Sequence, residues 1–242
     1  MNLAPRSATI FVFAKPPIAD RAKTRLAADV GAPLATALAK AFLHDLWSIA
    51  CAIPWADAVL AGTEPDPAAY GLDRSVPIEV QGEGDLGVRM ERMLLRGLAR
   101  SRHAFVVGTD VPGVGIAHFE RARDALATHD ACLAEAADGG FYLVGLTRHR
   151  AGLFDEVPWS VPETFERTRA QMRTVGLSVG VGAPWFDVDD AAGLEHALAH
   201  WDDVVARAPR TAAVLREHFA EGQGIDARIA AARDSARSHI RR

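Results

Sequence analysis

The sequence predicts an α/β fold with a mostly parallel mixed sheet and helices on both faces. Two observations support this prediction. Short apolar runs rich in Val, Ile, Leu, Phe and Ala recur along the chain, and over the first 130 residues they alternate with segments of helical periodicity. Strands that alternate with helices are joined by crossover connections, which make neighbouring strands parallel. The expected strands are residues 8–14, 57–61, 77–81, 104–108, 131–136 and 141–146.

The helices are expected between and after these strands. Pro33 suits the first position of a helix that runs through about Ala52, and Asp85 suits the N-cap of a second helix that runs through Leu98. Four further segments have helical spacing: 115–127, 163–175, 190–206 and 209–221.

The chain shows no internal repeat and no long linker, which favours a single domain over residues 1–222. Residues 223–242 are rich in Ala and Arg and poor in large apolar side chains, so a frayed helix or a disordered tail is expected there. No catalytic role is assigned to this tail.

The composition limits the functional classes. A net charge of -4 argues against general nucleic-acid binding, which requires a broadly basic surface. Cys51 and Cys132 are far apart in apolar surroundings, so neither a disulfide framework nor a thiolate metal site is expected. No apolar run approaches the roughly 18 residues of a membrane span. The protein is expected to be cytoplasmic, with neither nucleic acid nor membrane as partner.

A basic loop follows the first expected strand. Lys15, Arg21, Lys23 and Arg25 lie within eleven residues, directly after an apolar run that Pro16 and Pro17 end. Like charges held this close repel one another, so the loop is expected to bind an anion, most simply phosphate. Ligands of parallel sheets bind at the carboxyl ends of the strands, where this loop is predicted to lie.

Asp110 follows the fourth expected strand, in the segment Gly108-Thr-Asp-Val-Pro-Gly113. This position puts a carboxylate at the same edge of the sheet. Mg²⁺ takes oxygen ligands and shares them with phosphates, so a carboxylate beside a phosphate loop suits a metal-bridged nucleotide. The alternative is a local turn in which Asp110 bonds its own backbone.

A second acidic cluster, at residues 185–190, follows another short expected strand. Alternation turns Asp187 and Asp189 to one side and Val188 to the other. Two carboxylates that face one point indicate a cation. The alternative is that Asp189 or Asp190 caps the helix that follows.

Two glycine-containing turns allow a structural and a functional interpretation. Asp138-Gly139-Gly140 between two apolar runs is a strong hairpin signal, although Asp138 also suits a sugar hydroxyl. Gly84 and Asp85 lie at the entry to a helix, whose free N–H groups suit an anion, and the alternative there is an ordinary capped helix start.

Taken in order, several segments resemble a bacterial family of glycosyltransferase-like proteins. They are FAKPP with AKTRLA, GEGDLGVRM, GTDVPG, ADGGFYLVGL, PWS and FDVDD, and the resemblance covers roughly residues 8–220. Members have the single-domain, Rossmann-like nucleotide-diphospho-sugar transferase (GT-A) fold and are often labelled arsenosugar-type or radical-SAM-associated transferases. More distantly the chain is similar to the molybdenum-cofactor and phospholactate guanylyltransferases, and the phospholactate enzymes have a comparable basic loop.

The resemblance implies a role for each motif. The implied catalytic residues are Asp110, Lys23 and Asp138, and the implied metal is Mg²⁺ or Mn²⁺, held by Asp110, Asp187 and Asp189. The nucleotide and its phosphates are assigned to Lys15, Lys23, Arg25, Gly84 and Asp85, and the acceptor or sugar to Gly139, Gly140 and Trp159, together with Asp138.

One departure from the family bears on the reaction. Asp20 stands where members usually have glycine, so a turn made for close approach to phosphate carries a carboxylate. The leading hypothesis is transfer of a sugar from a nucleotide-diphosphate donor to a small acceptor. The alternative is nucleotidyl transfer from a nucleoside triphosphate to a phosphorylated small molecule, with release of pyrophosphate. A third is a non-catalytic nucleotide-binding domain.

Overall fold

The computed structural model describes residues 7–18 and 23–219. Asp20, Arg21 and the tail from 223 to 242 lie outside the described residues. The chain divides into two compact units. The sheet unit comprises the chain up to Lys15, Trp47–Gly108 and Gly115–Trp185, and the helical unit comprises Pro16–Leu46, Thr109–Val114 and the residues from Phe186 onward.

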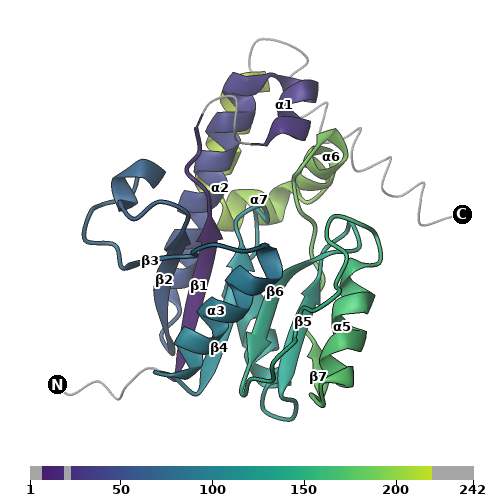
Figure 1. Ribbon diagram of the computed structural model, residues 1–242. Helices are drawn as coiled ribbons and strands as arrows, with labels where there is room; N and C mark the ends of the chain where they lie inside the picture. The colour runs from purple at the N-terminus through teal and green to yellow at the C-terminus, as the bar shows by residue number, and fades with distance from the viewer. Residues whose placement is uncertain (1–6, 19–22, 220–242) are drawn as a thin grey trace, which may run out of the picture. The chain divides into compact units, whose positions relative to one another are not determined.

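The sheet unit contains a seven-stranded sheet of order β3-β2-β1-β4-β6-β5-β7 (Figure 1). Strand β6 runs antiparallel to both of its neighbours, and the other pairings are parallel. This mostly parallel mixed sheet confirms the predicted fold class, and the β5–β6 pairing confirms the predicted hairpin. The strands are β1 (Ala8–Ala14), β2 (Ala56–Gly62), β3 (Ile78–Val80), β4 (His103–Gly108), β5 (Ala131–Glu135), β6 (Phe141–Leu146) and β7 (Val179–Val181).

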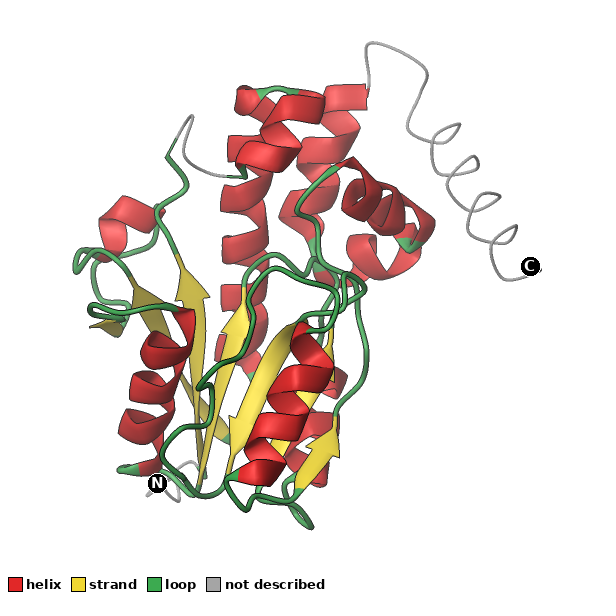
Figure 2. Cartoon of the chain, turned by 45° about the vertical axis from the view of Figure 1, so that its right-hand side comes forward, coloured by secondary structure: helices red, strands yellow, loops and turns green. Residues whose placement is uncertain are grey.

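Helices cover both faces of this sheet (Figure 2). Phe11 and Val106, which pair in register, share a buried cluster with Met93 of α3 and Met172 of α5. Phe105 points to the other face because side chains alternate along a strand. There a β-carbon at Gly145 would meet both Phe105 and Leu126, the C-cap of α4. The helices are α3 (Leu86–Leu98), α4 (Ile116–Ala125) and α5 (Thr164–Thr174), with a short 3-10 helix at Pro67–Tyr70.

The sheet is stabilised by the burial of its apolar side chains. Phe11 and Phe105 lie on opposite faces, and both are fully buried. Each such side chain contributes roughly 1.5–3 kcal/mol relative to an exposed one. The sheet unit therefore has buried apolar side chains on both faces of its sheet.

The helical unit is built from short helices: α1 (Thr24–Val30), α6 (Ala191–Ala199), α7 (Trp201–Arg207) and α8 (Pro209–Phe219). Helix α2 (Ala32–Ala52) supplies residues to both units. The buried carboxylate of Asp45 on α2 accepts hydrogen bonds from the backbone N–H and the hydroxyl of Thr211, both at 2.9 Å. It thereby caps the N-terminus of α8.

Two details differ from the sequence prediction. The segment predicted as one helix over 190–206 forms two helices, because the backbone leaves the helical region at His200 with ψ of 32°. Helix α1 was not predicted and begins inside the basic loop. Its Leu26 is fully buried, so tertiary burial compensates for its short length.

Within residues 7–18 and 23–219, no helix combines the length and the apolar character needed to cross a bilayer.

Candidate functional site

The segment Thr109–Val114 is held by two hydrogen bonds within the helical unit. The backbone N–H of Val188 donates to the carbonyl of Asp110 at 2.8 Å, and the guanidinium of Arg207 donates to the carbonyl of Gly113 at 3.0 Å. These bonds fix the backbone that carries Asp110, beside the segment that carries Asp189.

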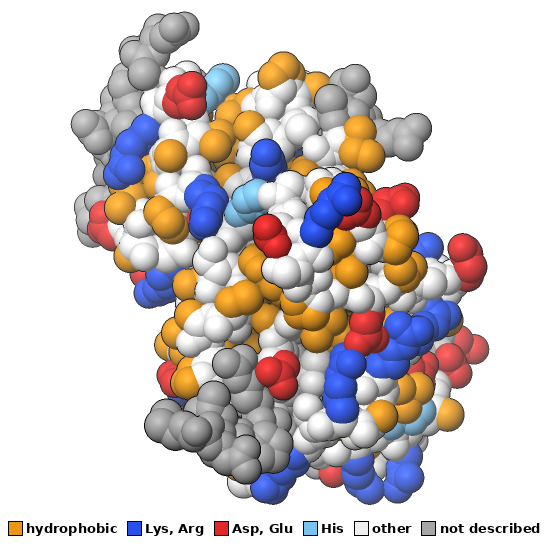
Figure 3. Space-filling model, turned by 90° about the vertical axis from the view of Figure 1, so that its left-hand side faces the viewer, with side chains coloured by type: hydrophobic (Ala, Val, Ile, Leu, Met, Phe, Trp, Pro, Cys, Tyr) orange, Lys and Arg blue, Asp and Glu red, His pale blue; other side chains and the backbone are white. Residues whose placement is uncertain are grey.

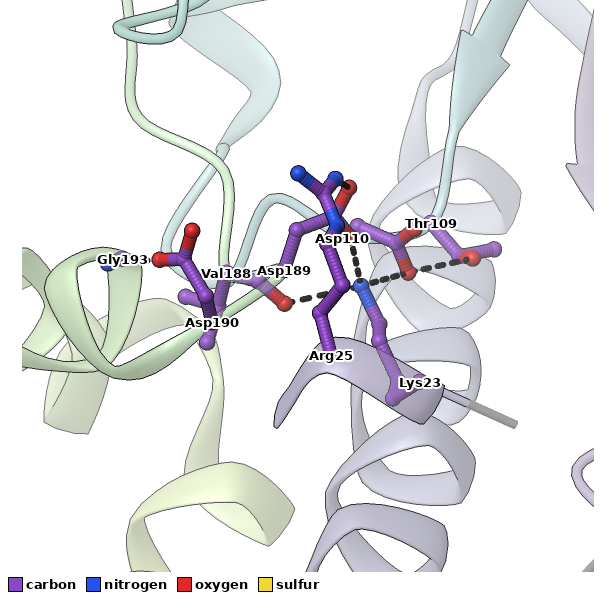
Figure 4. A network of polar contacts seen from close by, with 8 residues as sticks. All are labelled: Lys23, Arg25, Thr109, Asp110, Val188, Asp189, Asp190 and Gly193. Atoms are coloured by element: carbon purple, nitrogen blue, oxygen red, sulfur yellow. Dashed lines mark hydrogen bonds and ion pairs between the residues drawn. The ribbon is translucent and has the colours of Figure 1, made fainter. Parts of the chain in front are cut away.

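Lys23 lies at the centre of the candidate site (Figure 4). Its Nζ atom lies 2.7 Å from Oδ1 of Asp110, 2.7 Å from Oδ1 of Asp189 and 2.8 Å from the carbonyl oxygen of Val188. An ammonium has three N–H donors, so these three oxygens satisfy it completely. The Lys23 side chain is only 6% exposed, which strengthens the ion pairs relative to surface pairs.

The backbone of Lys23 is strained. This residue is the N-cap of α1 and has φ 52° and ψ 51°, in the left-handed region that side chains other than glycine rarely adopt. Such a conformation costs of order 1–3 kcal/mol and occurs where the surrounding structure imposes it. The contacts of the Lys23 side chain therefore stabilise this backbone conformation.

The structure separates the roles of the two adjacent aspartates. The Oδ1 atom of Asp190 accepts from the backbone N–H of Gly193 at 3.0 Å, so Asp190 is the N-cap of α6. Asp189 turns instead to the basic residues, and its Oδ2 atom lies 2.7 Å from the guanidinium of Arg25. The alternative in which Asp189 caps the helix is therefore excluded.

The electrostatics of Asp189 reflect its partners. Burial alone would raise the pKa of its carboxyl group, but the charges and hydrogen bonds of Lys23 and Arg25 outweigh burial and lower that pKa. With Asp110, the site therefore holds two cations and two carboxylates. The four formal charges cancel.

The oxygens around Lys23 suit a hard divalent cation in kind. Two carboxylates and a backbone carbonyl are ligands that Mg²⁺ and Mn²⁺ accept, and Mg²⁺ commonly binds one or two carboxylates together with waters and phosphates. In the described part of the chain, however, no three His, Cys, Asp or Glu side chains gather at one point. The network in Figure 4 contains Asp189 and not Asp187, whose role as a ligand stays a prediction.

Two members of this site had not been predicted. The hydroxyl of Thr109 donates to Oδ1 of Asp110 at 3.2 Å, and the carbonyl of Val188 accepts from Lys23. The position of Thr109 next to Asp110 is a usable sequence signal. A backbone carbonyl carries none, since every residue has one.

The other predicted site residues belong to the sheet unit. Lys15 is exposed just after β1. Asp85 accepts from the backbone N–H of Val88 at 2.9 Å, so it is the helix cap that the sequence also allowed. The guanidinium of Arg89 donates to the carbonyl of Gly84 at 2.8 Å. Binding of an anion by this loop stays a prediction.

The turn at Asp138 is explained by packing within the sheet unit. Oδ1 of Asp138 accepts from the backbone N–H of Gly140 at 2.8 Å. Gly139 has φ of 84°, and a β-carbon there would overlap with the carbonyl oxygen of Pro162. Trp159 is half-buried, with its ring 6.0 Å from that of Phe154. An acceptor role for these residues stays a prediction.

Comparison with known proteins supports the fold class. The chain is 26% identical to a protein from Desulfovibrio desulfuricans G20 that is provisionally assigned as a nucleotide-diphospho-sugar transferase. The match has a TM-score of 0.79 and covers 93% of this chain and 98% of that one. The α/β fold is therefore that of nucleotide-sugar-transferase-like proteins. A sequence model of a family described as an uncharacterized protein conserved in bacteria (DUF2064) matches residues 48–161.

Two weaker likenesses carry no argument about this chain. One is CMP:2-keto-3-deoxy-manno-octonic acid synthetase complexed with CTP, at 12% identity and a TM-score of 0.49, covering 81% of this chain and 99% of that one. The other is the bifunctional IspDF from Campylobacter jejuni, at 14% identity and a TM-score of 0.45, covering 73% and 50%. No curated protein matches the sequence significantly. The narrower resemblance to arsenosugar-type or radical-SAM-associated transferases stays a prediction.

Proposed function

We propose that this chain is a metal-dependent transferase that takes a sugar from a nucleotide-diphosphate donor and gives it to a small acceptor. The observation that carries the proposal is the chain of ion pairs in which Lys23 contacts both Asp110 and Asp189, and Asp189 also contacts Arg25. The similarity to the assigned nucleotide-diphospho-sugar transferase over nearly the full length supports it. The proposed setting is the cytoplasm.

The two cations suit a diphosphate leaving group. Arg25 is 64% exposed and presents a planar guanidinium, which matches two phosphate oxygens at once. Lys23 adds a compact charge nearby. As the sugar leaves, negative charge develops on the diphosphate, and fixed cations that meet this charge lower the barrier.

Asp110 and Asp189 are the residues proposed to hold Mg²⁺ or Mn²⁺. A bound ion of this kind would supply a Lewis acid that neutralises phosphate charge. Asp138, Gly139, Gly140 and Trp159 remain the proposed acceptor residues, because an aromatic face and a glycine turn both suit a sugar surface.

The decisive test is product analysis. The protein is incubated with a panel of nucleotide-sugars and of nucleoside triphosphates, each with candidate acceptors and Mg²⁺, and the released products are separated. Release of a nucleoside diphosphate from nucleotide-sugars is expected. Pyrophosphate from triphosphates alone would instead assign nucleotidyl transfer. Thermal stabilisation by a nucleotide without any turnover would support a non-catalytic domain.

A variant tests the site itself. Asp110→Asn removes one carboxylate and should lower turnover by roughly two orders of magnitude or more, since oriented charges supply the largest catalytic contribution. Glu195→Gln removes one exposed carboxylate from α6 and is the matched control. Near-normal turnover of Asp110→Asn would contradict the proposal.

A further inference from the structure

The two carboxylates of the site already share a cation, the ammonium of Lys23. Its ammonium has oxygens at 2.7, 2.7 and 2.8 Å and is almost fully buried. These oxygens include one from each of the two carboxylates proposed to hold a metal. The Oδ1 atoms of Asp110 and Asp189 already contact the ammonium of Lys23. A divalent cation that binds these carboxylates therefore has to compete with Lys23.

We propose, on the basis of the proposed function, that Lys23 exchanges these carboxylates for phosphate oxygens during ligand binding. The divalent cation and the diphosphate then bind as a pair, each weakly without the other. Lys23 is thus a resident counter-ion of the site before ligands bind and a phosphate ligand afterwards.

The charge balance explains why the pair is preferred. The two cations and two carboxylates cancel, so a divalent cation alone adds an uncompensated positive charge beside Lys23 and Arg25. A diphosphate alone adds negative charge beside Asp110 and Asp189. Uncompensated like charges this close repel one another at the effective dielectric of a protein surface, so either mismatch weakens binding. A divalent cation paired with the doubly charged diphosphate of a nucleotide-sugar carries no net charge and avoids both mismatches.

The local geometry is consistent with an exchange. Lys23 is held in a left-handed backbone conformation, and its ammonium also lies 5.6 Å from the centre of the Phe42 ring. Asp110 remains 42% exposed and Asp189 33% exposed, so solvent and ligands reach both carboxylates. A metal ion can therefore replace Lys23 at the two carboxylates, and phosphate oxygens can replace the carboxylates at Lys23.

The test measures Mn²⁺ binding without any nucleotide, by the electron paramagnetic resonance signal of free Mn²⁺. Lys23→Met should bind Mn²⁺ alone at least about tenfold more tightly than the wild type, because it removes the competing charge. Lys40→Met removes an exposed lysine of α2 and should behave as the wild type. Lys23→Arg keeps the charge and should also bind Mn²⁺ weakly.

Pyrophosphate provides the second measurement, by calorimetry with the metal chelated. Lys23→Met should bind pyrophosphate at least about tenfold more weakly than the wild type, and Mn²⁺ should tighten pyrophosphate binding to the wild type by a similar factor. If Lys23→Met does not fold, Lys23→Gln takes its place, because it also removes the charge and keeps a hydrogen-bond donor.

The outcomes separate the two proposals. Equal Mn²⁺ affinity of wild type and Lys23→Met would overturn the exchange. A pyrophosphate affinity that is the same with and without Mn²⁺ would overturn it as well. Neither result bears on the proposal of sugar transfer, which the product analysis tests with the wild type. Absence of Mn²⁺ binding in every variant, with and without pyrophosphate, would overturn both the exchange and the metal-dependent function.

Discussion

The ammonium of Lys23 lies 2.7 Å from Oδ1 of Asp189, although the two residues are 166 positions apart in the chain. This single ion pair joins the start of α1 to the segment that precedes α6. The pair lies within the helical unit, together with Asp110 and Arg25. It converts two separate sequence motifs into one site.

Two neighbouring aspartates should respond differently to substitution. Asp189→Asn removes a partner of Lys23 and Arg25 and should lower turnover by roughly two orders of magnitude. Asp190→Ala removes the N-cap of α6 and should lower the free energy of unfolding by about 1 kcal/mol. Steady-state kinetics and urea denaturation of both variants check this, and the opposite assignment of the two effects would contradict the described site.

Gly139 should not tolerate a side chain. A β-carbon there would overlap with the carbonyl oxygen of Pro162, and φ is 84°, so Gly139→Ala should cost about 3 kcal/mol of unfolding free energy. Gly176 has φ of 86°, and a β-carbon there would meet no heavy atom within 4 Å, so Gly176→Ala isolates the backbone cost. That control should lose only about 1 kcal/mol. Equal losses in urea denaturation would show that the contact with Pro162 is unimportant.

Asp130 should contribute to acid sensitivity. Hydrogen bonds from Arg148, together with those from Ser178, lower the pKa of its carboxyl group. An aspartate in an unfolded chain has a pKa of about 3.9, so its stabilising contribution is present above that pH and is lost as the pH falls below it.

The measurement is the free energy of unfolding between about pH 2 and pH 6, a range that brackets the pKa of an unfolded aspartate. Asp130→Asn should be less stable than the wild type at the upper end and should lose less stability on acidification. Asp124→Asn, which alters an exposed carboxylate, is the control and should retain the wild-type slope. A wild-type slope in Asp130→Asn would refute the assignment.

The two cysteines should differ in reactivity towards a thiol reagent. Burial raises the pKa of the Cys132 thiol to about 12, and Cys51 is exposed on α2. Because the thiolate is the reactive form, Cys51 should react fast and Cys132 only as the protein unfolds. In Cys51→Ser the fast phase should vanish. A remaining fast phase would show that β5 opens readily.

Exposed apolar side chains lie among charged ones on the side of the sheet unit that carries β3 (Figure 3). Val80 is 39% exposed at the edge strand, and Leu86, Val88 and Leu95 of α3 are similarly exposed. No function is assigned to these side chains.

The elements of the sheet could be predicted from local sequence patterns. Apolar runs located β1, β2, β4 and β6 to within a residue, and the Asp138-Gly139-Gly140 turn predicted the hairpin, because these signals depend on neighbouring residues only. Asp85 was correctly expected as a helix cap for the same reason. The break at His200 and helix α1 were missed, since tertiary packing decides whether such short segments are helical.

The pairing of acidic residues with cations could not be predicted from such patterns and follows from the fold of the chain. Alternation allowed Asp187 and Asp189 equally, and either Asp189 or Asp190 was a possible cap. In the folded chain, Asp190 accepts a hydrogen bond from the backbone N–H of Gly193, and Asp189 pairs with Lys23. Ion pairs act through space and have no dependence on chain separation, so a local pattern shows which charges are present and not which partner each one finds.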